Sequence, residues 1–188
     1  MNLKRLTRLI VCALLGGCVI LPEPVGQVPA VLEPEDWEGY WISSTEDDVV
    51  YAVVTDRQRG TLEMSGIEKE APENGPPRAR LERLEALVRV AGEVLLLSVP
   101  VEKEPGYVFF ALKKEGDRVT LSFPDAKCVK ALIEGGTLSG SERSPFTIAL
   151  DRLDPVQAVS QAAPMGCNIF DWDKTVVFRR LRKQARHE

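Results

Sequence analysis

The side chains that most often carry out catalysis are scarce in this chain. Its single histidine, His187, is the next-to-last of 188 residues. A catalytic triad needs a histidine held by a packed scaffold, so this position argues against such a triad and against a histidine-containing zinc site. The sequence also has no Gly-x-Ser-x-Gly motif, P-loop or dinucleotide-binding fingerprint. We therefore expect no cofactor and no catalytic residue, and favour binding over catalysis.

Carboxylates are plentiful, and they are densest in Glu46-Asp47-Asp48 and Asp171-Trp172-Asp173. Either group could offer oxygen ligands to Ca²⁺, but neither has the alternating spacing of a calcium-binding loop. We interpret both as solvated loop charge and expect no metal. Acid–base hydrolysis would need two carboxylates about 5–9 Å apart in a cleft, and this remains the least favoured hypothesis.

The N-terminus has the three-part organisation of a secretory signal. Lys4, Arg5 and Arg8 form a positive region, Leu9–Leu15 is apolar, and Gly16-Gly17 precedes Cys18. The apolar run is too short to span a bilayer, which takes about 20 residues. The alternative is an ordinary signal peptide with a cysteine there by chance.

Leu15-Gly16-Gly17-Cys18 resembles the lipobox of bacterial lipoproteins. The resemblance implies that residues 1–17 are removed and that Cys18 becomes the acylated, palmitate-bearing N-terminus. Val19 follows Cys18 where enterobacterial sorting would use Asp to retain a lipoprotein in the inner membrane. This implies a bacterial outer-membrane protein with its domain facing the periplasm.

The predicted cleavage changes the composition of the chain. It leaves 171 residues, and three of the 24 basic side chains depart, so 21 remain against 28 acidic ones. The mature protein is therefore acidic and shows no electrostatic feature typical of nucleic-acid binding.

Cys128 and Cys167 remain as a pair after Cys12 leaves with the signal and Cys18 is acylated. In an oxidising periplasm such a pair favours a disulfide, and the alternative is two separate buried thiols. A catalytic cysteine is disfavoured because no interior histidine could activate it.

Residues 18–35 are rich in proline, with Pro22, Pro24, Pro29 and Pro34. This favours an extended, lipidated tether that would reach about 50 Å at about 3.1 Å per residue. The alternative is an irregular arm packed on the domain, in which Val28, Val31 and Leu32 could dock.

From residue 36 to 188, short apolar runs alternate with turn residues, which predicts one mainly β domain. Segment 78–91 is compatible with a helix or a strand, and the turn at Ala91-Gly92-Glu93 favours the strand. Short helices are expected after Asp125, ending at Gly135-Gly136, and over Val156–Ala162. The other expected strands are Trp41-Ile42, Val49–Thr55, Thr61–Ile67, Val94–Val99, Tyr107–Leu112, Arg118–Phe123, Phe146–Leu150 and Thr175–Leu181. About eight strands with one or two short helices near the C-terminal end predict a small antiparallel β-barrel.

Gly39-Tyr40-Trp41, together with Arg179 or Arg180 on the last strand, resembles the calycin (lipocalin-like) superfamily. There, a Gly-x-Trp on the first strand packs at the closed end of the barrel under a late-strand cation. The resemblance implies that these four positions, Gly39, Trp41, Arg179 and Arg180, are structural and bind no ligand. A generic β-sandwich or open barrel is the alternative fold.

We expect a non-catalytic envelope protein that binds either a small apolar ligand or an envelope protein partner. The alternative is a structural or assembly factor of an envelope complex, with a barrel filled by side chains. Large residues such as Phe109, Phe123, Phe146 and Trp172, all pointing inward, would leave no pocket. Small inward-facing residues would leave a cavity.

Overall fold

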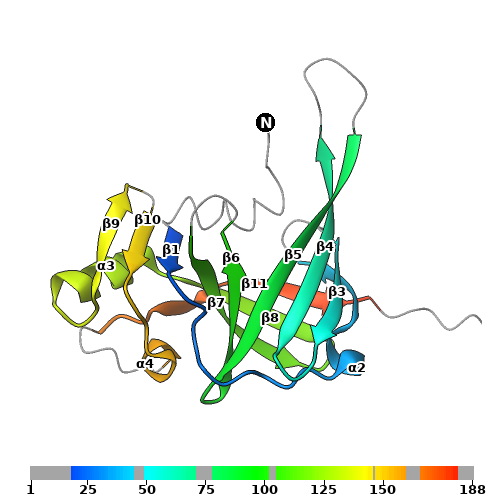
Figure 1. The fold of residues 1–188 in the computed structure, drawn as a ribbon, viewed down its shortest axis with the longest axis horizontal. Helices are drawn as coiled ribbons and strands as arrows, with labels where there is room; N and C mark the ends of the chain where they lie inside the picture. Colours follow the sequence, from blue (N-terminus) through cyan, green and yellow to red (C-terminus); the bar gives the residue numbers. More distant parts are fainter. Residues whose placement is uncertain are drawn as a thin grey trace, which may run out of the picture.

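The structure, a computed structural model, describes residues 18–44, 49–70, 78–101, 105–145, 147–159 and 166–181. The expected signal peptide, residues 1–17, lies outside these ranges, as do the Glu46-Asp47-Asp48 cluster and Phe146. Figure 1 shows a barrel flanked on one side by a smaller layer of strands and helices.

Eight strands form a closed antiparallel barrel, which confirms the predicted fold class. Consecutive strands pair from β2 to β8, and β11 closes the ring by pairing with both β8 and β2. Their bounds are β2 Gly39–Ser43, β3 Val49–Asp56, β4 Thr61–Glu70, β5 Arg78–Ala91, β6 Val94–Pro100, β7 Tyr107–Glu115, β8 Arg118–Pro124 and β11 Phe170–Arg180.

A second layer extends the sheet outward from β7. The short strand β1, Cys18–Leu21, pairs antiparallel with the start of β7 and parallel with β10, Thr147–Leu150. Next to β10 lies β9, Gly140–Ser144. Helices α3, Ala126–Glu134, and α4, Pro155–Val159, lie on the same side of the barrel (Figure 1).

Two separate apolar cores result from these layers. The inner core fills part of the barrel, whereas the outer core lies between the barrel wall and the second layer. On β6 and β7, successive residues alternate between the two: Leu97 and Phe110 belong to the inner core, and Leu96 and Phe109 to the outer core. This explains why these strands have nearly continuous apolar sequences, as expected for strands that are buried on both faces.

Local signals in the sequence placed several elements correctly. Segment 78–91 is a strand along its whole length; residues 78–87 pair with β4 and residues 87–91 with β6. The hairpin around Gly116, where φ is +56°, joins β7 to β8; β7 continues to Glu115, three residues closer to the turn than expected, and β8 begins at Arg118 as expected. The Asp125 carboxylate caps α3 by accepting hydrogen bonds from the backbone N–H groups of Lys127 and Cys128.

The Pro-rich segment differs from the tether expected from the sequence. After β1 it runs along the outside of the barrel and then across one end to helix α2, Pro34–Trp37 (Figure 1). The Val25 N–H donates to Ser98 Oγ at 3.0 Å, and the Ala30 N–H donates to the Val88 carbonyl, also at 3.0 Å. Leu32 is fully buried, whereas Val28 and Val31 are exposed.

Packing and hydrogen bonds explain why this arm is held. Although prolines prevent regular structure, free N–H groups of the arm donate to the β3–β4 turn, to β5 and to β6, and Ala30 and Leu32 belong to the inner core. Gly60 allows the close approach, because a Cβ there would lie 2.7 Å from the Ala30 carbonyl oxygen and 2.5 Å from that of Val88.

Candidate functional site

The barrel encloses an apolar cavity of about 110 Å³. Strands around the whole ring contribute to its lining, and the lining carries no charged side chain. The lining residues are Trp37, Trp41, Val50, Ala52, Leu62, Met64, Leu84, Leu97, Val99, Val108, Phe110, Leu112, Val119, Leu121 and Phe178. A cavity of this character favours hydrocarbon and offers no hydrogen bonds to a polar group.

One end of the barrel, which we call the closed end, is covered by the arm and α2. It is the end that carries the β3–β4, β5–β6 and β7–β8 turns. Along β5, the inward-facing side chains change from half-buried Leu84 to fully buried Ala86 and Val88 as the strand approaches this end. Within the described part of the chain, the lining side chains are therefore more exposed toward the opposite end.

Arg180 holds α2 against the closed end. Its guanidinium donates hydrogen bonds to the carbonyl oxygens of Glu35 and Glu38. It also lies over the Trp41 ring, with 5.8 Å between the guanidinium carbon and the ring centroid. The Trp41 indole N–H donates to the Trp37 carbonyl at 2.9 Å, which ties β2 to the same helix.

Of the four positions that the calycin resemblance implied, three lie together in the structure and the fourth, Arg179, lies apart. Gly39, Trp41 and Arg180 lie together, and Gly39 has a φ of +131° with its missing Cβ position 3.3 Å from Arg180 Nε. A side chain at residue 39 would be strained and would crowd the guanidinium. Arg179 points to the outer face and is exposed, so the cation at the closed end is Arg180.

A second cation at the closed end was not recognised in the sequence. The Lys114 side chain is 13% exposed, with Nζ 5.6 Å from the Trp37 ring centroid and 3.5 Å from Asp36 Oδ1. Trp37 was also missed as a site residue. It precedes the Gly-x-Trp triplet by only two positions, and its inward direction depends on α2, for which Pro34 at the first helical position was the available signal.

The large aromatic residues do not all point inward. Phe109 packs in the outer core, edge-to-face with Phe170 at 5.9 Å, and Trp172 packs against the same core beneath Lys113. Phe123 is half-buried at the inner core, edge-to-face with Phe110. Phe109 and Trp172 thus pack in the outer core and do not fill the barrel, which retains its cavity.

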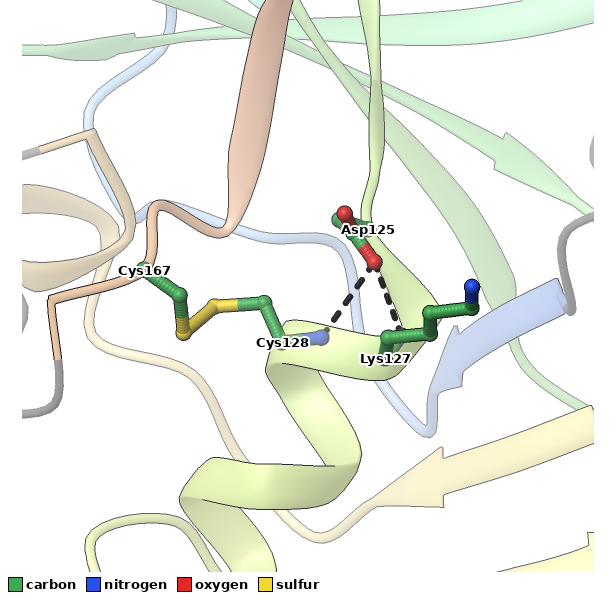
Figure 2. The surroundings of a disulfide bond; sticks show 4 residues. All are labelled: Asp125, Lys127, Cys128 and Cys167. Atoms are coloured by element: carbon green, nitrogen blue, oxygen red, sulfur yellow. Dashed lines mark hydrogen bonds between the residues drawn. A yellow bond between two sulfur atoms is a disulfide. The ribbon is translucent and has the colours of Figure 1, made fainter.

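Cys128 and Cys167 form a disulfide that fastens the second layer, as predicted. It joins the first turn of α3 to the segment that leads into β11, with 5.8 Å between the Cα atoms. Figure 2 shows the bond beside the Asp125 cap, so the same turn of α3 is held by a covalent link and by two hydrogen bonds.

Cys18, the residue expected to carry lipid, begins β1. Its Cα pairs in register with that of Thr147, and the residue is 9% exposed as part of the inner core. The rest of β1 is also buried, so the expected anchor residue is joined directly to the folded domain without a spacer.

In the carboxylate cluster Asp171-Trp172-Asp173, local contacts stabilise the charge of Asp171. The Lys174 ammonium, 3.0 Å from Asp171 Oδ2, and the Asp173 backbone N–H hold the pKa of the Asp171 carboxyl below its usual value. In turn, Asp171 raises the pKa of Lys174. Within the described ranges, no group of three or more His, Cys, Asp or Glu side chains is arranged to hold a metal ion.

Comparison of the chain with protein-family models, with curated proteins and with solved structures found no match. Among the helices of the described residues, none has the length and apolar character needed to cross a bilayer.

Proposed function

We propose that this protein is a lipid-anchored envelope lipoprotein whose barrel binds a small apolar ligand. The observation that carries the ligand-binding part is the cavity of about 110 Å³ with its uncharged lining. For scale, an engineered apolar cavity of about 150 Å³ stays dry and binds benzene. Hydrocarbon that enters such a space is stabilised by about 25 cal/mol per Å² of apolar surface removed from water.

The calycin-like closure of the barrel supports the same proposal. Gly39, Trp41 and Arg180 combine at the closed end as the resemblance implies, and the arm blocks that end. A ligand would therefore enter from the opposite end, where Met64, Leu84 and Val101 are only half-buried. Its hydrocarbon part would occupy the cavity, and a polar group would stay outside.

The anchor part of the proposal rests on the lipobox resemblance at Leu15–Cys18. A diacylglyceryl group on Cys18 needs the sulfur to face the bilayer, because two long acyl chains exceed the volume of the barrel cavity. We therefore include in the proposal that Cys18 turns outward when it is acylated. With the arm packed on the barrel, the domain would lie close to the outer membrane, facing the periplasm.

Intact-mass measurement of protein extracted from envelopes tests both parts. Under denaturing conditions, the wild type should lack residues 1–17 and carry the mass of the acyl groups, and Cys18→Ala should carry none. Equal acyl mass, or equal palmitate label, in both forms would contradict the anchor. Under native conditions, the wild type should retain one small apolar molecule.

A second candidate function, docking of an envelope protein partner, is favoured by an exposed aromatic pair. Tyr40 and Tyr51 are register partners on the outer face of β2 and β3, with ring centroids 4.8 Å apart and exposures of 53% and 39%. Tyrosines are enriched at protein interfaces. If the native mass spectrum showed one bound protein in place of a small molecule, it would favour this candidate and a structural role in an envelope complex.

A further inference from the structure

Part of the cavity lining comes from helix α2, which is not one of the barrel strands. Trp37 belongs to α2, yet its side chain lines the cavity together with Leu112 and Val119, which lie toward the closed end of their strands. The residue is 7% exposed and belongs to the inner core. The indole therefore forms part of the floor of the cavity.

Contacts on several sides of α2 fix this indole in place. Arg180 binds the carbonyl oxygens on either side of Trp37, at Glu35 and Glu38, and the Trp41 indole N–H binds the carbonyl of Trp37 itself. Lys114 lies against the ring from β7. A ligand that reaches the floor thus meets a rigid side chain.

The shape of the cavity indicates the class of ligand. On β7 the lining runs from Val108 to Leu112, which is about 13 Å at about 3.3 Å per residue. A cavity of about 110 Å³ whose lining follows this length of strand accommodates an elongated apolar group. An unbranched alkyl chain fits both this shape and the uncharged lining.

We propose that Trp37 sets the depth of the cavity and thereby the length of alkyl chain that the barrel accepts. This inference rests on the proposed ligand-binding function and specifies its ligand class and its length selectivity. Replacing the indole by a smaller side chain joins the freed space to the cavity. Each further CH₂ that becomes buried strengthens binding about fourfold, so two further CH₂ groups strengthen it about fifteenfold.

A series of ω-bromo alkan-1-ols of increasing length provides the test. Bromine quenches tryptophan fluorescence at short range, so chains inside the barrel report through Trp41, which lines the cavity. The protein extracted from envelopes is titrated in lipid nanodiscs as wild type, Trp37→Leu and Trp37→Phe, with protein-free nanodiscs as reference. Thermal unfolding of each variant verifies that it is folded.

The matched control is Trp172→Leu, which removes the same side chain from the outer core. We expect the best-bound chain to be longer in Trp37→Leu than in the wild type, intermediate in Trp37→Phe, and unchanged in Trp172→Leu.

The remaining outcomes separate the two proposals. Binding by the wild type and both Trp37 variants with the same preferred length would overturn the role of Trp37 and leave ligand binding intact. Binding by Trp37→Leu alone would overturn ligand binding by the native barrel while supporting the role of Trp37. Saturable binding by neither form would overturn both.

Discussion

Arg179 and Arg180 are adjacent in the sequence but lie on opposite faces of β11. Arg180 faces the closed end, where it binds two carbonyl oxygens of the α2 region and covers Trp41. Arg179 is exposed on the outer face. The sequence could not distinguish them because two adjacent arginines are equivalent until the strand register is known, and a one-residue shift would exchange their roles.

Arg180→Gln should lower the free energy of unfolding by about 2 kcal/mol, because it removes two charge-assisted hydrogen bonds that hold α2 against the barrel. Arg179→Gln is the matched control and should change stability by no more than about 0.5 kcal/mol. Urea unfolding of both variants measures the difference. Equal losses in the two variants would show that Arg180 does not hold α2 in place.

The second layer is held to the barrel by apolar packing and by a disulfide. Helix α3 presents Val129 and Leu132 to the outer core, and the disulfide ties its first turn to the segment before β11. The N-cap, the terminating glycines and the cysteine pair are local signals, which explains why α3 and its covalent link could be predicted from the sequence.

Replacing Cys128 and Cys167 together by Ala should lower the free energy of unfolding by about 4 kcal/mol, the chain-entropy value for a closed loop of about 40 residues. Chemical denaturation of the oxidised wild type and the double variant measures this loss. The reduced wild type is the control and should resemble the variant. A loss below about 1 kcal/mol would mean that the disulfide adds little to the packing of the outer core.

Among the elements that sequence analysis did not predict, β1 and the packed proline-rich arm are defined by tertiary contacts, whereas β9 is a local hairpin partner of β10. Strand β1 has only four residues, and its partners β7 and β10 are distant in the sequence. The proline-rich arm has no periodicity, and it is held by distant contacts such as those with Ser98 and Gly60. For a related reason, the sequence did not decide whether the barrel is hollow or filled. Phe109 and Phe110 are both buried, so only the register of β7 decides which of them enters the barrel.

The two apolar cores of the molecule have different roles. The outer core takes Phe109, Phe170 and Trp172 and stabilises the second layer, which leaves the inner core free to remain incompletely filled. A cavity lined by apolar side chains costs stability when it is empty, because its lining loses contacts. A ligand that fills it restores those contacts, and this makes the cavity the feature on which the proposed function depends.

Ligand binding in the barrel is tested by titrating the envelope-extracted protein in nanodiscs with a short ω-bromo alkan-1-ol. Ala52, which lines the cavity, is replaced by Leu to fill it, and neighbouring Val53, which does not line the cavity, is replaced by Leu as the control. We predict saturable, one-to-one quenching of tryptophan fluorescence in the wild type and in Val53→Leu, with binding at least about tenfold weaker in Ala52→Leu, since the added side chain occupies volume the ligand needs. Quenching that never saturates, or that is the same in all three proteins, would contradict ligand binding in the barrel.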